Sequence, residues 1–280
     1  MSITSILAAL NPVPPAAKAD LPYVFAFLLI LLTTAILRLL YILPAIHRTR
    51  SPSRTRGKPT HILIVLGSGG HTTEMLSYLS SLSPTAYQQR TYITSSGDDF
   101  SALKATEFED ALAAKATGSA KRFVDDPRKR VTGEVEWNEC CVRGGIRRQG
   151  YSIYTVPRAR KIHQSLLTTP ISSWHCLHAC LSLLQSLHVP DLILSNGPAT
   201  ALIMIVAANI LRFFSFLPVY SRFGAAGKMR IIYVESWARV KRPSLSGRII
   251  VWCGLCDRVL VQWKGLETRG WGEYRGVLVR

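Results

Sequence analysis

The feature that most constrains the fold is a series of short aliphatic runs separated by segments long enough to form helices. Amphipathic stretches such as TTEMLSYLSSL lie between most of the runs. In chain order the six runs are HILIVLG (61–67), RTYITSS (90–96), YSIYTVP (151–157), DLILSNG (191–197), RIIYVES (230–236) and RVLVQW (258–263). Continuous apolar strands that alternate with helices are typical of a parallel sheet covered on both faces. The pattern therefore predicts an α/β domain over 60–280, with its ligand at the carboxyl ends of the strands.

An apolar segment precedes this domain. Residues 21–43 carry one charge, Arg38, and are about as long as a helix that crosses a bilayer. Arg38 lies near the end of the segment, where its side chain can reach the membrane surface. The sequence therefore predicts a transmembrane helix over 21–43.

The charges on either side of this segment predict its orientation. Residues 1–20 hold only Lys18 and Asp20, whereas the linker 44–59 is rich in Ser, Pro and Arg. The positive-inside rule then places residues 1–20 in the lumen or outside the cell and the main domain in the cytosol. A cleaved signal peptide is the alternative, but the apolar core is long and the basic cluster follows it rather than precedes it.

Two other stretches need an interpretation. The apolar run from Ala199 to Tyr220 is interrupted by Asn209 and Arg212 and bracketed by strand-like segments, so we expect a buried helix rather than a second span. The interval 98–150 is dense in charge and poor in apolar periodicity, which predicts a flexible insertion on the cytosolic side.

Charge and cysteine content narrow the class of protein. The formal net charge of +17 favours an anionic partner such as a phosphorylated substrate or an acidic membrane face. Six cysteines in 280 residues do not make a disulfide scaffold. The Cys253-Gly-Leu-Cys256 pair has no second pair at metal-binding spacing, so we expect buried thiols, no metal and a reducing compartment.

The first strand ends in a glycine-rich loop that runs directly into a helical pattern. Glycines allow close approach of the backbone, and the first amides of a helix attract anions, so the loop predicts a phosphate site. Its residues are Gly67, Ser68, Gly69, Gly70, His71 and Thr72. The loop lacks the GxxxxGK[ST] pattern, and Thr72 stands where a dinucleotide fingerprint needs its third glycine. Nucleotide binding stays open as an alternative, because Asp98 or Asp99 could bind a ribose.

His71 at the helix start could donate to phosphate or act as a base, and it could equally cap or pack the helix.

Polar residues also follow the other strands. They are Arg158 and Arg160, Asn196 and Gly197, and Glu235 and Arg239. Glu235 could orient a sugar hydroxyl or cap a helix. Because the carboxyl ends of parallel strands meet at one edge, we expect these residues on one rim.

Six segments in fixed order resemble the membrane-anchoring subunit of the eukaryotic UDP-GlcNAc transferase family, which adds the second GlcNAc to dolichyl-diphosphate-GlcNAc in N-glycan assembly. They are GSGGHTTEM, PRARKIHQS, PDLILSNGPAT, YVESWARV, SLSGRIIVW and DRVLVQW. The resemblance runs from about Ile62 to the C-terminus, apart from the charged interval. Ala199, Pro243 and Lys264 depart from the family pattern.

The resemblance implies half of a split GT-B glycosyltransferase. This chain would supply the acceptor-side, Rossmann-like N-terminal half, and a soluble partner subunit would supply the catalytic half that binds UDP-GlcNAc. The loop from Gly67 to Thr72 would hold the diphosphate of the dolichol carrier. The tail would dock the partner through Tyr274, Gly276, Leu278 and Val279. The family also implies the endoplasmic reticulum membrane and the continuous nuclear membrane.

The implied reaction is attack of the acceptor hydroxyl on the anomeric carbon of UDP-GlcNAc with inversion, and His71 or Glu235 could take the proton. No metal, cofactor or nucleic acid is expected, whereas membrane lipids are expected partners. Two other functions stay open. One is a self-sufficient membrane glycosyltransferase acting on a polyprenyl-linked sugar. The other is a membrane-tethered, nucleotide-binding oxidoreductase, against which the missing third glycine argues.

Overall fold

A computed structural model describes residues 15–43, 60–82, 87, 89–117, 143–148, 150–160, 164–165, 167–197, 199–224 and 229–277. The chain divides into two compact units, Met1–Ile42 and Leu43–Arg280.

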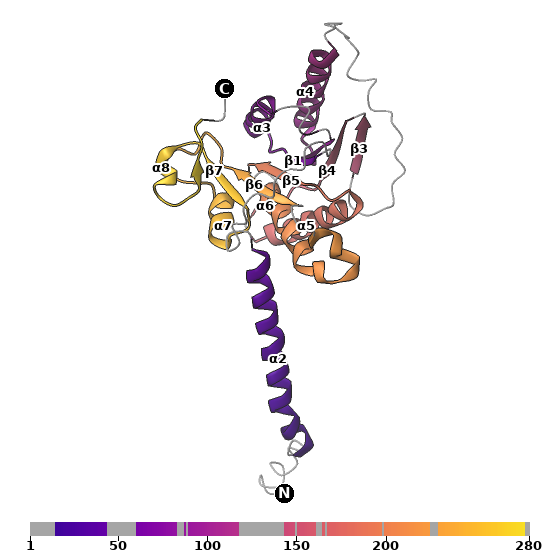
Figure 1. Ribbon diagram of the computed structural model, residues 1–280, viewed down its shortest axis with the longest axis vertical. Coiled ribbons are helices and arrows are strands. Elements are labelled where there is room, and N and C mark those ends of the chain that lie inside the picture. Colours follow the sequence, from indigo (N-terminus) through magenta and orange to yellow (C-terminus); the bar gives the residue numbers. More distant parts are fainter. Residues whose placement is uncertain are drawn as a thin grey trace, which may run out of the picture. The chain divides into compact units, whose positions relative to one another are not determined.

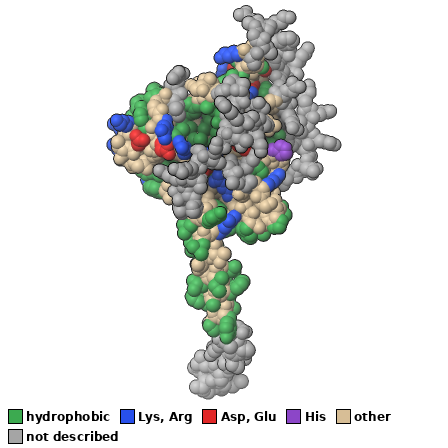
Figure 2. Space-filling model, in the orientation of Figure 1, with side chains coloured by type: hydrophobic (Ala, Val, Ile, Leu, Met, Phe, Trp, Pro, Cys, Tyr) green, Lys and Arg blue, Asp and Glu red, His purple; other side chains and the backbone are tan. Residues whose placement is uncertain are grey.

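The first unit contains one long helix, α2 (Pro15–Ile42). Its part Pro22–Ile42 has a mean hydropathy of 2.3 and none of it is buried. Hydrophobic side chains cover this part of the helix (Figure 2). The hydroxyls of Thr33 and Thr34 donate to the carbonyls of Leu29 and Ile30 at 2.8 Å, so neither needs a water partner. Length and composition thus suit a membrane span, as the sequence predicts for 21–43.

The second unit is built on one eight-stranded sheet, in the order β3-β4-β2-β1-β5-β6-β7-β8 (Figure 1). All neighbouring strands are parallel except β3 and β4. The strands are β1 (His61–Val65), β2 (Gln89–Ser95), β3 (Arg143–Arg148), β4 (Tyr151–Val156), β5 (Leu192–Asn196), β6 (Arg230–Val234), β7 (Arg258–Val261) and β8 (Glu273–Tyr274). All six predicted strands are confirmed, and so is the predicted α/β class.

Helices cover both faces of the sheet (Figure 1). Side chains alternate along β1: Ile62 and Ile64 pack in one core cluster with α3, and Leu63 and Val65 pack in the other. One face carries α3 (Gly70–Ser80) and α4 (Asp99–Thr117), and the other carries α5 (Thr169–Ser186), α6 (Ala199–Phe213) and α7 (Leu245–Cys253). Burial on both faces explains why the strands read as continuous aliphatic runs.

The apolar run after β5 is the core helix α6, as predicted, although Ala199–Phe216 is also long and apolar enough to span a membrane. The polar residues of α6 form hydrogen bonds within the α/β unit. Asn209 donates from Nδ2 to the carbonyls of Ile205 and Leu255 at 2.9 and 3.0 Å. Arg212 donates to the Met229 carbonyl. Helix α6 is followed by two 3-10 helices, η2 (Phe214–Phe216) and η3 (Pro218–Gly224).

The prediction of a flexible insertion over 98–150 is wrong for part of that interval. Residues Asp99–Thr117 form the 19-residue helix α4, and Arg143–Arg148 form the antiparallel edge strand β3. Helix α4 contributes Ala105 and Phe108 to the core on its face of the sheet. Residues 118–142 and the linker 44–59 lie outside the described residues.

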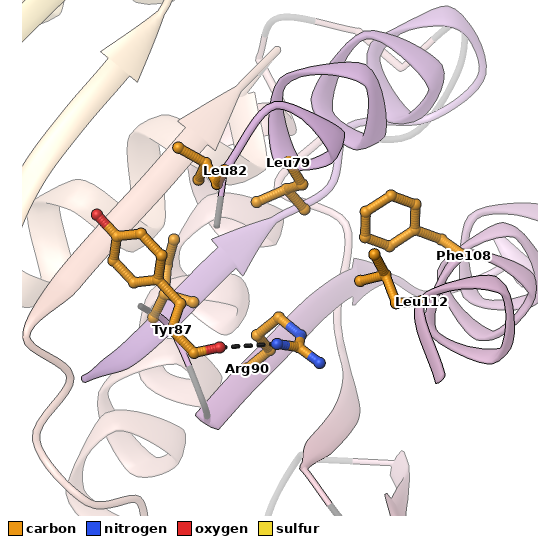
Figure 3. Close-up of a pocket in the computed structure, with 7 residues that line it drawn as sticks. Leu79, Leu82, Tyr87, Arg90, Phe108 and Leu112 are labelled. Carbon is orange, nitrogen blue, oxygen red and sulfur yellow. Dashed lines mark hydrogen bonds between the residues drawn. The ribbon is translucent and has the colours of Figure 1, made fainter. Parts of the chain in front are cut away.

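A small recess lies near the starts of β1 and β2, between α3 and α4 (Figure 3). Its volume is about 20 Å³, room for little more than one water. Its cation, Arg90, donates to Glu109 Oε1 and Oε2 at 2.5 and 2.6 Å and to the Tyr87 carbonyl at 2.7 Å. The recess thus lies at the amino ends of the strands, away from the glycine loop. The positive charge of Arg90 is already paired with Glu109, so it is not available to a ligand.

Candidate functional site

The site lies where the strand order reverses. The chain moves from β1 to β2 on one side, and after β4 it returns to place β5 on the other side of β1. The carboxyl ends of such a pair of strands diverge and leave a crevice for a ligand. The glycine loop follows β1, and Gly197 follows β5, so both predicted loops meet at this point.

The glycine loop leaves the start of α3 open. Gly69 has φ +64° and no side chain caps the helix. A Cβ added at Gly69 or at Gly70 would meet no atom within 4 Å, and Ser68 is exposed. Thr72, which the sequence predicts to line the phosphate site, has a buried side chain, and its hydroxyl donates to the Gly67 carbonyl. The helix therefore begins beside open space at Gly69 and Gly70, an arrangement that suits an anion.

His71 packs on two glycines beside this opening. A Cβ on Gly67 would lie 2.7 Å from the His71 Cβ, and one on Gly197 would lie 3.1 Å from the His71 Cγ. Gly197 also has φ +100°, which other residues rarely adopt. The glycine after β1 and the glycine after β5 thus together make room for the imidazole, whose side chain is 32% exposed.

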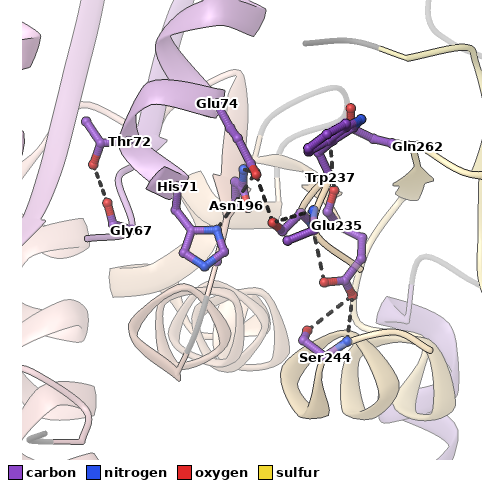
Figure 4. A network of polar contacts seen from close by, with 12 residues as sticks. Gly67, His71, Thr72, Glu74, Asn196, Glu235, Trp237, Ser244 and Gln262 are labelled. Atoms are coloured by element: carbon purple, nitrogen blue, oxygen red, sulfur yellow. Dashed lines mark hydrogen bonds and ion pairs between the residues drawn. The ribbon is translucent and has the colours of Figure 1, made fainter. Parts of the chain in front are cut away.

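A carboxylate that the sequence analysis did not identify ties this region together (Figure 4). Glu74 Oε2 accepts from Asn196 Nδ2 at 2.7 Å, and Glu74 Oε1 accepts from Ser236 Oγ at 2.8 Å. Its Oε2 also lies 3.8 Å from His71 Nδ1. The available signal was the spacing, because residues i and i+3 on a helix share one face.

The predicted rim residues occupy different environments. Asn196 is fully buried and its amide is held by Glu74. Arg158 donates to the carbonyls of Ser96 and Gly97 at 2.8 and 3.1 Å, and it lines a groove of about 920 Å³ beside the end of β4. Arg160 donates to the Gln164 carbonyl at 3.0 Å. Arg239 is exposed. The two arginines after β4 therefore also order the loops around them.

Glu235 faces the start of α7 rather than the glycine loop. It is 2% exposed, and its Oε2 accepts from the Ser244 amide at 3.2 Å and from the Ser244 hydroxyl at 3.1 Å. Ser244 is the N-cap of α7. Burial raises the pKa of Glu235, and the hydrogen bonds from Ser244 only partly offset this. These contacts favour the helix-capping interpretation of Glu235 and leave His71 as the better-exposed candidate base.

The raised pKa of Glu235 predicts a pH-dependent stability. A carboxyl whose pKa is higher in the folded state contributes most below its unfolded pKa, and the contribution is lost as the pH rises through the folded pKa. We therefore expect the free energy of unfolding to fall as the pH rises above about 4.5, the ordinary glutamate value. Glu235→Gln should remove this decline, as urea unfolding in detergent at several pH values would measure. An equally steep decline in the variant would contradict the assignment.

The carboxylate of Asp98 is already hydrogen-bonded within the protein and is not available to bind a ribose. Its Oδ1 accepts from the Ser101 amide at 3.2 Å and its Oδ2 from the Ser101 hydroxyl at 2.7 Å, so it caps the start of α4. Among the residues that the structure describes, no group of three potential metal ligands comes together. The thiols of Cys176, Cys180 and Cys256 are buried as expected, whereas Cys253 is exposed, contrary to the prediction of buried thiols.

The C-terminal segment leaves from the edge of the sheet. Tyr274 belongs to β8, which pairs only with β7, and its amide donates to Glu267 Oε1 at 3.0 Å. Gly276 has φ +89° and open space around it, and Val277 is half-exposed. The remaining residues predicted to dock a partner, Leu278 and Val279, lie outside the described residues.

Comparisons with known proteins place this chain in a family. A family model described as "Oligosaccharide biosynthesis protein Alg14 like" matches residues 62–278. A UDP-N-acetylglucosamine transferase subunit alg14 from Aspergillus fumigatus is 35% identical, over 71% of this chain and 96% of that protein. The subunit ALG14 from Yarrowia lipolytica is 34% identical over 89% of this chain and 95% of that protein. The human subunit ALG14 is 33% identical over 79% of this chain and 83% of that protein.

Among solved structures, MurG from Acinetobacter baumannii aligns with a TM-score of 0.42 and 10% identity, over 73% of this chain and 41% of that chain. The family model covers residues 62–278, which include the glycine loop and the start of α7, and the relatives align over most of their own length. The chain therefore belongs to the Alg14 family of oligosaccharide biosynthesis proteins.

Proposed function

We propose that this chain is the membrane-bound, acceptor-binding subunit of a two-subunit UDP-GlcNAc transferase that adds the second GlcNAc to dolichyl-diphosphate-GlcNAc. The observation that carries the proposal is the open start of α3, with Gly69 and Gly70 free of neighbours and His71 beside them. A helix start of this kind offers backbone amides and the positive end of the helix dipole. Both interact favourably with the diphosphate of a lipid-linked sugar.

The number of sheets among the described residues supports this division of roles between two subunits. A GT-B enzyme binds donor and acceptor in two Rossmann-like halves, and the described residues of this chain form one sheet. The donor half then belongs to a soluble partner subunit, which binds UDP-GlcNAc. The C-terminal segment from Tyr274 onward, which includes Gly276, is the proposed contact with that partner.

The helix α2 supports a role at a membrane. Its span Pro22–Ile42 is long and apolar enough to anchor the chain. An anchor in the membrane that carries the dolichol acceptor raises the effective concentration of the acceptor at the α/β unit. We place this membrane in the endoplasmic reticulum, with residues 1–20 in the lumen and the α/β unit in the cytosol.

The test is a transfer assay with three arms. GlcNAc transfer from UDP-GlcNAc to a phytanyl-diphosphate-GlcNAc acceptor is measured with this chain alone, with the soluble partner subunit alone, and with both. We expect transfer only when both are present. A parallel arm replaces the acceptor by phytanyl phosphate, which lacks the sugar and should give no product.

Two results would overturn the proposal. Transfer by this chain alone would mean that it is a self-sufficient glycosyltransferase with its own donor site. Undiminished transfer by the partner alone would mean that this chain does not bind the acceptor. A binding measurement with NAD(P) tests the alternative of a nucleotide-binding oxidoreductase. We expect no binding, because Asp98 caps the start of α4.

A further inference from the structure

Glu74 joins α3 to the ends of two strands of the sheet. It lies at the start of the second turn of α3, and its two oxygens accept hydrogen bonds from Asn196 at the end of β5 and from Ser236 just after β6. Its side chain is only 15% exposed. A carboxylate held from two sides by hydrogen bonds keeps its position. Glu74 is thus fixed in place beside His71.

His71 presents one ring nitrogen to this carboxylate and leaves the rest of the ring open. Its Nδ1 is completely covered and has no hydrogen-bond partner among the described residues, while the side chain as a whole is 32% exposed. The exposed part of the ring therefore lies away from Nδ1. The Glu74 Oε2, 3.8 Å from Nδ1, is the acceptor toward which Nδ1 points (Figure 4). Contacts of this kind often shorten when a substrate binds.

Glu74 is ionised under ordinary conditions. Burial opposes its ionisation, but the polar contacts with His71, Asn196 and Ser236 together outweigh burial, so the pKa of Glu74 lies below its ordinary value of 4.5. An ionised carboxylate accepts hydrogen bonds only. The nitrogen that faces it is then the one that carries the proton of a neutral imidazole.

We propose that Glu74 is a positioning residue, which holds the proton of His71 on Nδ1 and leaves the lone pair of Nε2 for the acceptor hydroxyl. This inference rests on the proposed function. In the transfer step, the acceptor oxygen forms a bond to the anomeric carbon of UDP-GlcNAc, the bond from that carbon to UDP breaks, and UDP leaves with the electron pair. The hydroxyl proton passes to His71 Nε2. Glu74 touches no reacting atom and acts only through His71.

The test uses the complete complex of the full chain and its partner subunit, with Glu74→Gln as the variant. Glutamine has nearly the same shape, can accept from Asn196 and can donate to the Ser236 oxygen, but it carries no charge to select the tautomer. We expect the transfer rate at saturating acceptor to fall by about 100-fold, with a much smaller change in KM. The matched control is Glu107→Gln, which removes an exposed carboxylate of another i,i+3 pair, with Lys104, and should keep the wild-type rate.

A double-mutant cycle separates positioning from structural support. If Glu74 acts through His71, Glu74→Gln should cause little further loss in a His71→Ala background. If the losses multiply instead, Glu74 works independently of His71 and the proposal is wrong. Wild-type rates in the single variant Glu74→Gln would overturn it equally.

A spectroscopic measurement does not depend on activity. In the full chain labelled with ¹⁵N-histidine, the His71 signals, assigned with His71→Ala, should show a protonated Nδ1 and an unprotonated Nε2. Glu74→Gln should shift the population toward the Nε2–H tautomer. An Nε2–H tautomer in the wild-type protein would overturn the inference. A wild-type complex without transfer activity would instead count against the proposed function and leave this measurement as the test of Glu74.

Discussion

Alanine in place of His71 is expected to lower GlcNAc transfer by the reconstituted complex by about 100-fold to 10,000-fold, the usual contribution of a positioned acid or base. The side chain of His71 is 32% exposed beside the glycine loop, whereas Glu235 is buried against α7. The initial rate with both subunits present measures the effect. The fraction of protein in membranes should not change, because α2 is untouched.

The matched control for this variant is His178→Ala. His178 is exposed on α5, on the other face of the sheet from α3. Its removal should leave the transfer rate within about twofold of the wild type, as surface substitutions usually do. Full activity of His71→Ala would remove His71 from the site and return it to the role of a packing residue on Gly67 and Gly197.

The sheet could be predicted from the sequence because its strands are buried on both faces. The six predicted strands are runs rich in aliphatic and aromatic residues between helix-length segments, a pattern typical of a parallel sheet covered on both faces. The seventh parallel strand, β8, is only two residues long and has no such run. The edge strand β3 could not be predicted, because Arg143–Arg148 is basic and glycine-rich. Helix α4 was missed for a related reason: its buried face is small, and its many charges resemble those of a solvated loop.

The candidate site could be predicted only where one short stretch of sequence forms it. The loop from Gly67 to Gly70 and its open helix start follow from local residue types. The packing of His71 on Gly197, and the bonds of Glu74 to Asn196 and Ser236, join residues more than 120 positions apart. A local sequence pattern does not predict contacts between residues so far apart in the chain. For the same reason the sequence could not decide whether Glu235 faces the acceptor or the start of α7.

Alanine in place of Gly247 is expected to destabilise the α/β unit by about 3 kcal/mol, through overpacking and the loss of buried hydrogen bonds. Gly247 lies in the first turn of α7, and a Cβ there would be 2.1 Å from Glu235 Oε2 and 3.2 Å from Ser244 Oγ. Glu235 is only 2% exposed, so its carboxylate cannot turn into solvent to avoid the new methyl group. Urea unfolding of the full chain in detergent measures the effect.

The matched control is Gly265→Ala in helix α8 (Lys264–Glu267). A Cβ at Gly265 would meet no atom within 4 Å, so alanine should be neutral there or stabilise the helix by up to about 1 kcal/mol. The two variants make the same chemical change in a helix and differ only in what the new methyl group meets. A loss of stability at Gly247 alone would therefore report contact with Glu235 and Ser244.

Urea unfolding of the double variant Glu235→Ala with Gly247→Ala tests whether the Glu235 carboxylate lies against α7. If the carboxylate lies against α7, its removal relieves the overlap, and the double variant should be more stable than the sum of the two single effects. Additive effects, or a Gly247→Ala protein as stable as the wild type, would mean that the carboxylate points elsewhere. Glu235 would then be free to face the acceptor, and it would stand beside His71 as a second candidate for the proton acceptor.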